Sequence, residues 1–489
     1  MRRKLYSGIV KKLASSIAIL GITASSCAFA NQALDSQAAM NKEKKEEVTR
    51  EYKKHKHHKK HKCHCPGNQG WVLSSTGGLS YVHPNNDSHW FKLSGVIRLD
   101  ETLFMGSYRD KQPIYGTGSN AVNAVSFPSS ANLRRVEAYM DGGIGKNWEY
   151  TLGLTFFTGS NVRFTDTWLS YTGFLENNQV FVGRVSGNWF GLDNSNSTTW
   201  NPFLERSLAA SAFYPGDGLG VMTDFWWHNG AVTLAAMQPE QKPNSNGVQS
   251  VFNNNGSEVI PGVRDRWRGT VRATVAPVHE VGNVWHFGIS GAYRELNSAV
   301  NGVAPTQQGT GVDFMVGPGA TGRNVISLLN TTTVNGGAPI CANNVRMFNV
   351  EMAKQHGPFM LEGEYTNVFV HRVNSTIGTV RFDGWNVQTR YLLTGEAHKY
   401  DVRDGNFSTV EPNNHYGAVE LAARYDYVTL NDKDVRGGSE HNVTVGLNWF
   451  INQQVRLSAN YIRAAIHPVL DAPKRNLDIV GMRCQVRFK

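Results

Sequence analysis

The chain has 489 residues, a formal net charge of +10 and a mean hydropathy of −0.36. No run of about 18 or more apolar residues follows the N-terminal segment, which excludes a membrane-spanning helix there, and the five scattered cysteines exclude a disulfide-framed domain. Residues 66–489 carry 34 basic and 34 acidic side chains, so the excess charge lies in the N-terminal region and gives no reason to expect nucleic-acid binding.

Residues 1–30 have the features of a secretory signal peptide. A cationic start precedes an apolar stretch at residues 13–23, and the sequence Ala-Phe-Ala at residues 28–30 fits a cleavage signal. The sequence therefore predicts export across the inner membrane, with the mature chain beginning near Asn31.

Residues 31–70 are rich in Lys, Glu and His and have too few large apolar side chains to bury a core, so we expect an exposed periplasmic extension. Its potential metal ligands lie close together in sequence: His55, His57, His58, His61, Cys63, His64 and Cys65. Imidazole and thiolate suit Zn, Cu or Ni, but this spacing matches no closed zinc site. Weak metal capture, a polybasic contact with peptidoglycan or lipid phosphates, and a short helical collar are three alternatives for this segment.

From residue 71 onward, segments of about ten residues alternate apolar with polar side chains. Within residues 264–275, one face is mostly apolar and the other carries Arg264, Arg266, Arg268 and Arg272. The final segment, residues 480–488, likewise alternates Val, Met, Cys, Val and Phe with polar side chains. A period of two indicates strands with one face toward lipid and the other toward water.

Seven turns and four long connections separate these segments. The turns lie at residues 145–147, 176–178, 228–230, 277–283, 356–358, 394–413 and 452–454, and the long connections at 106–131, 186–216, 238–262 and 297–344. Seven turns on one rim, with both chain ends on that rim, predict sixteen antiparallel strands. Because lipid offers no hydrogen-bond partners, the sheet must close. We therefore predict an all-β transmembrane barrel over residues 71–489, with an aqueous bore.

Aromatic residues near the ends of these segments fit the girdles that barrels place at the two membrane interfaces. The candidates are Trp148, Trp168, Trp226, Trp227, Trp285, Trp449 and Tyr461. This interpretation predicts that their side chains lie on the outer face of the barrel.

The inner face of the predicted barrel is rich in arginine, since residues 66–489 hold 25 Arg and nine Lys. The guanidinium group keeps its charge and presents a planar fork to phosphate oxygens. A line of arginines along a wet wall is either an anion path or part of an ordinary polar wall, and the pattern alone leaves both open. No G-x-S-x-G, H-E-x-x-H or P-loop motif occurs, so we expect neither an enzyme nor a cofactor.

The barrel region resembles the phosphate-selective O and P type porins of the outer membrane. Similar stretches occur in order at residues 75–79 (STGGL), 92–95 (KLSG), 133–136 (LRRV), 204–206 (LER), 276–284 (APVHEVGNV), 292–294 (AYR), 393–396 (LTGE), 424–426 (RYD) and 457–461 (LSANY). The resemblance implies a sixteen-stranded homotrimeric porin of the cell outer membrane, whose long third loop folds inward to narrow the pore.

The resemblance also implies roles for individual residues. Arg134 and Arg135 match an arginine pair that binds anions near the constriction, although neighbours on a strand point to opposite faces unless the backbone is irregular. Asp166 matches an acidic residue that limits how tightly anions are held, and Arg206 matches a residue that follows the third loop. Arg268 and Arg272 match basic residues of the corresponding strand, so all of these are expected to line the pore.

Two departures weaken the expectation of phosphate specificity. Asn194 stands where phosphate-selective members have a lysine, and no Lys or Arg lies between Arg184 and Arg206. Val96 replaces an arginine of the first strand, although Arg98 follows on the same face. We therefore predict passive diffusion of small anions, with phosphate as a candidate, through an Arg-lined lumen. A general porin for small polar solutes with a metal-capturing tail is the alternative.

Overall fold

A computed structural model of the protein describes residues 70–73, 78–83, 86–105, 129–156, 162–185, 189–239, 251–252, 258–259, 265–296, 312–317, 329–331, 340–373, 376, 378–468 and 474–488. The chain divides into two compact units, Met1–Asn68 and Gln69–Lys489, and the described residues belong to the second. The predicted signal peptide and the His/Cys cluster lie outside them. Within the described residues, no helix is long and apolar enough to cross a membrane.

Strands make up most of the described structure. The main sheet contains β1 (Gly70–Leu73), β2 (Leu79–His83), β3 (Asn86–Met105), β4 (Ser130–Ile144), β5 (Trp148–Phe156), β6 (Val162–Tyr171), β7 (Asn178–Val185), β8 (Gly218–Trp227), β9 (Gly230–Pro239), β12 (Asp265–Glu280), β13 (Asn283–Leu296), β16 (Ala342–His356), β17 (Phe359–Arg372), β18 (Val380–Leu392), β21 (Ala418–Asp432), β22 (Val435–Phe450), β23 (Val455–His467) and β24 (Arg475–Phe488). Shorter elements lie in the connections: β10 (Val251–Phe252), β11 (Glu258–Val259), β14 (Met315–Val316), β15 (Leu329–Asn330), β19 (Tyr400–Asp401), β20 (Asn406–Phe407), α3 (Leu192–Ser195) and α4 (Leu208–Ala212).

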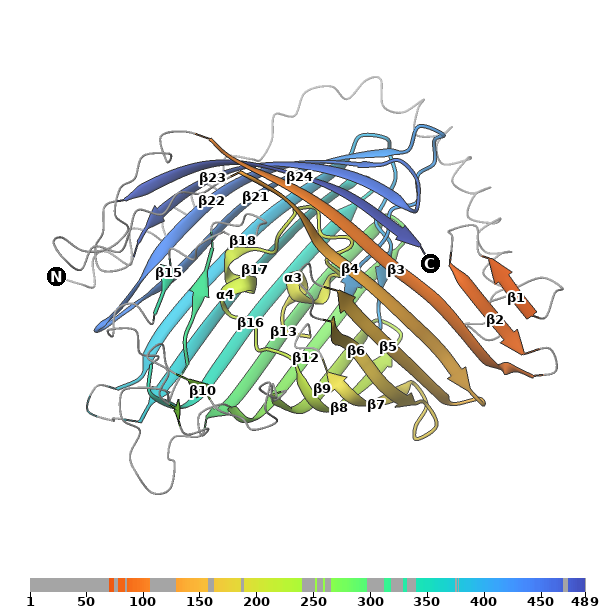
Figure 1. Ribbon diagram of the computed structural model, residues 1–489, viewed down its shortest axis with the longest axis horizontal. Helices are drawn as coiled ribbons and strands as arrows, with labels where there is room; N and C mark the ends of the chain where they lie inside the picture. The colour runs from red at the N-terminus through yellow and green to blue at the C-terminus, as the bar shows by residue number, and fades with distance from the viewer. Residues whose placement is uncertain are drawn as a thin grey trace, which may run out of the picture. The chain divides into compact units, whose positions relative to one another are not determined.

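Sixteen of the eighteen strands in the main sheet close into a barrel (Figure 1). Each of the sixteen pairs antiparallel with the next along the chain, and β24 returns to β3 with a register running from Asp478↔Met105 to Phe488↔Gly95. The other two strands, β1 and β2, form a hairpin on the N-terminal part of β3. The predicted closed barrel of sixteen strands is confirmed.

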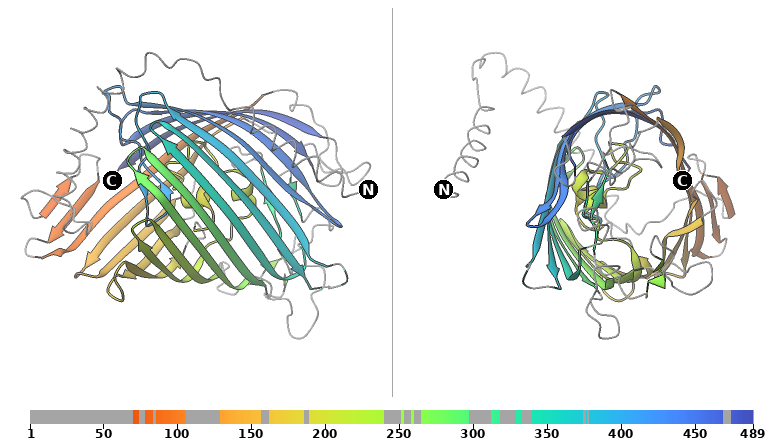
Figure 2. Two further views of the ribbon diagram at one scale, coloured as in Figure 1. Left: turned by 180° about the vertical axis from the view of Figure 1, so that it is seen from behind. Right: turned by 60° about the vertical axis from the view of Figure 1, so that its left-hand side comes forward.

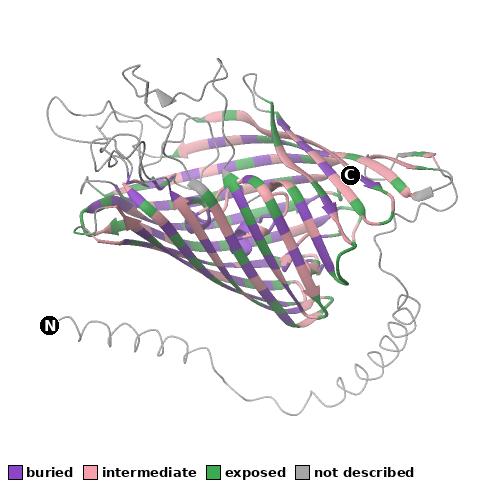
Figure 3. Ribbon diagram, turned by 90° about the horizontal axis from the view of Figure 1, so that it is seen from below, coloured by how far each residue is buried: buried purple, intermediate pink, exposed green. Residues whose placement is uncertain are grey.

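Side chains alternate between two environments along each long strand, which Figure 3 shows as stripes. In β16, Val345, Met347 and Glu351 are buried inside the barrel, whereas Phe348 and Met352 on the opposite face are 47% and 54% exposed. A barrel wall in contact with lipid has apolar side chains on its outer face. Its polar backbone groups are paired within the sheet, so they are not exposed to lipid without partners.

The seven predicted turns all join strands at the same rim. The connections there are residues 145–147, 172–177, 228–229, 281–282, 357–358, 393–417 and 451–454. Glycine suits the tight turns at Gly282 and Gly357, where φ is 74° and 55°. The long connection, residues 393–417, carries the β19–β20 hairpin.

The opposite rim bears the four predicted long connections, and two of these turn back into the barrel. The third loop, residues 186–217, contains α3 and α4, and the connection at residues 297–341 contains β14 and β15. Figure 1 places α3, α4 and β15 within the barrel, and Figure 2 shows segments inside the ring of strands. The predicted inward-folded third loop is confirmed.

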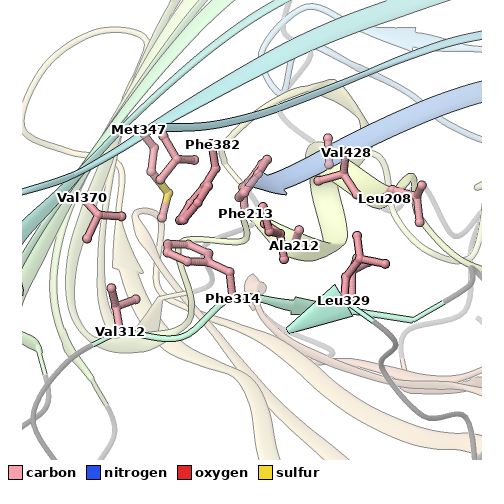
Figure 4. Packing of buried hydrophobic residues seen from close by; sticks show 14 of the residues in the cluster. Leu208, Ala212, Phe213, Val312, Phe314, Leu329, Met347, Val370, Phe382 and Val428 are labelled. Atoms are coloured by element: carbon pink, nitrogen blue, oxygen red, sulfur yellow. The ribbon is translucent and has the colours of Figure 1, made fainter. Parts of the chain in front are cut away.

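A hydrophobic core fills one side of the barrel, which the sequence did not predict. Phe314 of the 297–341 connection packs between Phe213 of the third loop and inward-facing Phe382 (Figure 4). Its ring centroid lies 5.9 Å from that of Phe213 and 5.5 Å from that of Phe382. Strands β16 to β24 contribute further apolar residues to this cluster, including Val345, Met347, Val370, Val428 and Ile479. The bore is therefore eccentric and runs along the other side of the barrel.

We expect Phe314→Ala to destabilise the protein by about 3–5 kcal/mol, because it removes a side chain that is 2% exposed and leaves a cavity in this core. Met315→Ala, at the next residue of the chain, is the matched control. Met315 is 46% exposed, so its loss should cost no more than about 0.5 kcal/mol. Urea unfolding of the reconstituted protein would measure both, and equal midpoints would contradict the packing described.

Candidate functional site

The third loop is fixed inside the barrel by hydrogen bonds to buried carboxylates. The Asp193 carboxylate accepts from Asn201 Nδ2 at 3.0 Å and from the Ser207 backbone N–H at 2.7 Å, which closes the loop on itself. The Asp193 backbone N–H donates to Glu364 of β17, which ties the loop to the wall. These bonds supply partners for backbone groups that have left the sheet.

The connection at residues 393–417 is held in the lumen in a similar way. Arg272 of β12 forms a buried ion pair with Glu351 at 2.6 Å, and it also donates to the carbonyl oxygens of Asp404 and Gly405, both at 2.8 Å. The side chain of Arg272 is almost fully buried. It lies inside the barrel, as predicted. Its hydrogen bonds hold the 393–417 connection against the wall.

Two histidines add contacts between the wall and the 393–417 connection. His286 Nε2 lies 3.0 Å from Glu351 Oε1, and His286 Nδ1 lies 2.8 Å from the hydroxyl of Tyr400. Burial raises the pKa of the Tyr400 hydroxyl, which keeps it protonated. His398 of the connection contacts Glu420 of β21 at 2.7 Å. The connection therefore docks through these polar contacts as well as through buried Phe407, which packs in one cluster with Val284 and Met360 of the wall.

Between these inserted segments and strands β3–β8 lies a cavity of about 960 Å³. Its wall carries five arginines, Arg135, Arg184, Arg206, Arg403 and Arg487, and seven carboxylates, Glu137, Asp141, Glu149, Asp166, Asp217, Asp224 and Asp404. Arginine does not dominate this part of the lumen. The wall has both signs, as a general porin would have.

Three of the five arginines have carboxylate partners in the same wall. Arg135 pairs with Glu137 at 3.0 Å, Arg184 with Asp217 at 3.2 Å, and Arg403 with Asp224 at 3.5 Å. The other two contact neutral groups. Arg206 donates to the side-chain oxygen of Asn194, and Arg487 lies over the ring of Trp200 with 4.3 Å to its centroid.

A smaller cavity of about 160 Å³ lies between the third loop and the wall, and arginine does dominate it. Its lining includes Arg98, Arg134, Arg135, Arg206 and Arg483, with Glu205 as the carboxylate among its lining residues. Arg134 pairs with Glu205 at 2.7 Å and Arg483 with Asp100 at 2.7 Å. Arg98 instead donates to neutral oxygens, those of Thr198, Thr199 and Gln485.

A β-bulge explains how neighbouring arginines share this cavity. The register of β4 on β3 passes from Arg98↔Arg135 to Leu99↔Leu133, so Arg134 is an extra residue with no partner on β3. The extra residue turns both guanidinium groups inward. The bulge is therefore the backbone irregularity that allows the neighbouring residues Arg134 and Arg135 both to point inward.

A second register shift affects Asp166. The partners Leu152↔Thr167 and Leu154↔Phe164 leave Thr165 and Asp166 together opposite Gly153. Both residues line the larger cavity. Asp166 therefore lies beside the pore, where the sequence placed it.

The remaining predicted residues fall in different surroundings. Asn194 lines the larger cavity but is 3% exposed, and its amide donates to the carbonyl of Phe190 at 3.1 Å. Arg268 donates to the carbonyl of Asp217 at 3.2 Å. Arg264 and the side chain of Arg266 lie outside the described part of the structure. Sequence reasoning missed Arg403, which lies in a connection without strand periodicity.

Two of the predicted girdle residues lie inside instead, so that prediction was wrong for them. Trp168 lines the larger cavity, and Trp226 lies under the guanidinium of Arg403, 4.5 Å from ring centroid to Cζ. Trp227 and Trp285, in contrast, are exposed on the outer face. Trp226 and Trp227 are sequence neighbours, so only one of them can face lipid.

The described residues include no group of three or more His, Cys, Asp or Glu side chains placed to hold a metal ion. The His/Cys cluster of the N-terminal segment lies outside those residues, so metal capture there stays a prediction. Ion pairs such as Arg272–Glu351 and His398–Glu420 surround the 393–417 connection.

A closed sixteen-stranded barrel with an apolar outer face and a charged lumen narrowed by inserted loops defines an outer-membrane porin. The chain belongs to the family described as phosphate-selective porin O and P, whose sequence profile matches residues 115–488. It is accordingly a diffusion channel of the outer membrane by family, rather than an enzyme.

The chain is also similar to several individual proteins. Porin O of Pseudomonas aeruginosa is 28% identical over 418 residues, which cover 80% of this chain and 86% of that protein. An uncharacterized protein of Caulobacter vibrioides is 26% identical over 344 residues, covering 68% of this chain and 62% of that protein. Among solved structures, an anion-selective porin from Comamonas acidovorans has a TM-score of 0.47 and 9% identity, covering 81% of this chain and 99% of that chain. OmpT of Vibrio cholerae has a TM-score of 0.46 and 11% identity, with coverage of 82% and 99%.

We expect Arg272→Gln to destabilise the protein by about 3–5 kcal/mol, because it leaves the buried Glu351 carboxylate without its cation. Single-channel recordings should also show larger current fluctuations, since the 393–417 connection loses two of its bonds. Lys354→Gln is the control. Lys354 lies on the outer face over Trp285, so its loss should cost about 1 kcal/mol or less.

The charge of the larger cavity should depend on pH near 6. Burial, reinforced by neighbouring Asp401, raises the pKa of the Asp404 carboxyl to about 6, against the opposing effect of Arg403. The group is ionised above that pH and neutral below it. Lowering the pH from 7.5 to 5 should therefore raise the permeability of chloride relative to potassium, as read from zero-current potentials. Asp404→Asn should reduce this change, and an unaltered pH profile in that variant would contradict the assignment.

Proposed function

We propose that this porin passes small anions in preference to cations, with inorganic phosphate among them. The observation that carries the proposal is the smaller cavity, where five arginines converge on the third loop and Glu205 is the one carboxylate among the described lining residues. Guanidinium groups bind phosphate oxygens through paired, charge-assisted hydrogen bonds. Arg98 and Arg206 donate to neutral partners, so an anion can replace those partners without breaking an ion pair.

The pore-lining set in this proposal is Arg134, Arg135, Asp166, Asn194, Arg206, Arg264, Arg266, Arg268 and Arg272. Arg206 is the member that we expect to matter most, because it lines both cavities and, unlike Arg135, is bonded to a neutral side chain. An ion that leaves the larger cavity for the smaller one would remain in contact with the same guanidinium group.

A general porin for small polar solutes is the second candidate. The larger cavity favours it, because seven carboxylates there outnumber five arginines. The two candidates differ in the sign of charge that crosses more easily, which makes them separable by one electrical measurement.

We also propose a homotrimer. Strands β5 to β9 have 8–10 residues, whereas the other barrel strands have 13–20. About 9–11 residues are needed to cross a bilayer, so this part of the wall does not rise above the membrane. A neighbouring copy placed against it would screen the lumen there. Separately, we propose that the N-terminal extension lies in the periplasm.

The proposal is tested by the zero-current potential in planar bilayers under a KCl gradient, followed by titration with phosphate. A zero-current potential of the sign expected for chloride, with a current that falls as phosphate is added, would support the proposal. In Arg206→Gln the phosphate concentration for half-block should rise about tenfold, since a hydrogen bond to a charged group contributes about 1.5–3 kcal/mol. Arg346→Gln, on the outer face, should change neither value. A potential near zero or set by potassium, without a phosphate effect, would favour the general porin.

A further inference from the structure

An apolar surface lines part of the open lumen, where a channel for inorganic ions has no need of one. Phe181, Met222, Ala235 and Met237 form a buried layer on the inner face of β7 to β9, and the partly exposed Trp168 and Trp189 pack on this layer. Trp168, Phe181, Trp189 and Met222 all line the 960 Å³ cavity. We call Trp168 and Trp189, with the layer beneath them, the aromatic shelf.

The local backbone accommodates the shelf. The Trp168 and Phe181 rings meet edge to face, with centroids 5.0 Å apart and an interplanar angle of 86°. Gly183 is the residue of β7 opposite Trp168, and its φ of 145° favours glycine. A Cβ at Gly183 would lie 2.7 Å from the Trp168 Cα. A larger residue at this position would therefore displace Trp168.

The groups that face the same cavity differ in kind. The third loop contributes short hydrogen-bonding side chains, such as Asn196, Ser197 and Thr198, together with Arg206. Of the cavity's arginines, Arg206 is bonded to an amide oxygen rather than to a carboxylate. One cavity therefore offers aromatic rings and a cation that, within the described part of the chain, is bonded to neutral groups.

The size of the cavity points the same way. Ligand sites of about 300–1,000 Å³ accommodate solutes of drug size, and this cavity of about 960 Å³ lies at the upper end of that range. A phosphate ion needs far less room. Apolar surface kept in contact with water is unfavourable, so a solute with an apolar face would gain by covering the shelf.

We propose that the channel favours organic anions that carry a flat apolar ring, with the ring on Trp168 and Trp189 and the anionic group at Arg206. This inference rests on the proposed anion preference and names the substrate class within it. Ring contacts add modestly to binding, so a ring should strengthen interaction with the pore by about three- to tenfold over the same head group without a ring.

The test compares block of the chloride current by benzenesulfonate and by methanesulfonate at pH 7.5, where both are fully ionised. Wild-type protein should be blocked at about three- to tenfold lower concentration by benzenesulfonate. Trp168→Leu and Trp189→Leu should bring this ratio toward one. Trp168→Phe should keep the ratio, because a ring remains. Trp385→Leu, on the outer face of β18, is the matched control.

The outcomes separate the inference from the function on which it rests. A chloride-set potential with equal block by the two sulfonates would overturn the inference and leave the anion preference standing. A potassium-set potential would overturn the anion preference itself. Selective block by benzylammonium over methylammonium, without selectivity between the sulfonates, would overturn the anionic class, since aromatic rings and the lining carboxylates also suit organic cations. A heat-dependent shift in gel mobility would verify that each variant has formed a barrel.

Discussion

Every backbone N–H and C=O group that lies in lipid needs a hydrogen-bond partner within the protein, and this constraint determines the barrel. No donor or acceptor of a membrane-spanning strand can turn to water, so β24 must return to β3 and close the sheet. Closure fixes the alternation of inner and outer side chains, and it leaves the connections at the two rims as the segments that can vary. The chemistry of the lumen is therefore built mainly from what those connections place inside it.

Segments that leave the sheet to enter the lumen must find new partners for their polar groups. The structure supplies them from the inner wall, with Glu364 for the third loop and Arg272 for the 393–417 connection. Inward-facing charge therefore has two uses in this barrel. Arg272, paired and almost fully buried, holds a segment in place, whereas Arg206 faces open space.

The sequence predicted the fold well because the constraint acts on every strand. Alternation identified the strands, and the turn residues identified all seven connections at one rim. The depth of a residue inside the lumen could not be predicted, because a period of two reports only the face on which a side chain lies. Met347 and Phe382 are apolar residues that face inward, and segments inserted into the lumen bury them. No pattern in the local sequence indicates that such segments are present. Trp168 was assigned to the wrong face for a related reason, since an aromatic residue near a strand end fits a girdle and an inner shelf equally well.

The bulge at Arg134 has an evolutionary consequence. A single extra residue in β4 sets the orientation of both members of the arginine pair, because it breaks the two-residue period at that position alone. Loss of one codon there would restore the regular period and leave the lumen with one guanidinium group fewer, without changing the residues of any other strand. The charge of such a channel can thus be altered by a change of length as well as by substitution, and relatives of similar sequence can differ in selectivity through an indel that a comparison of aligned residues would overlook.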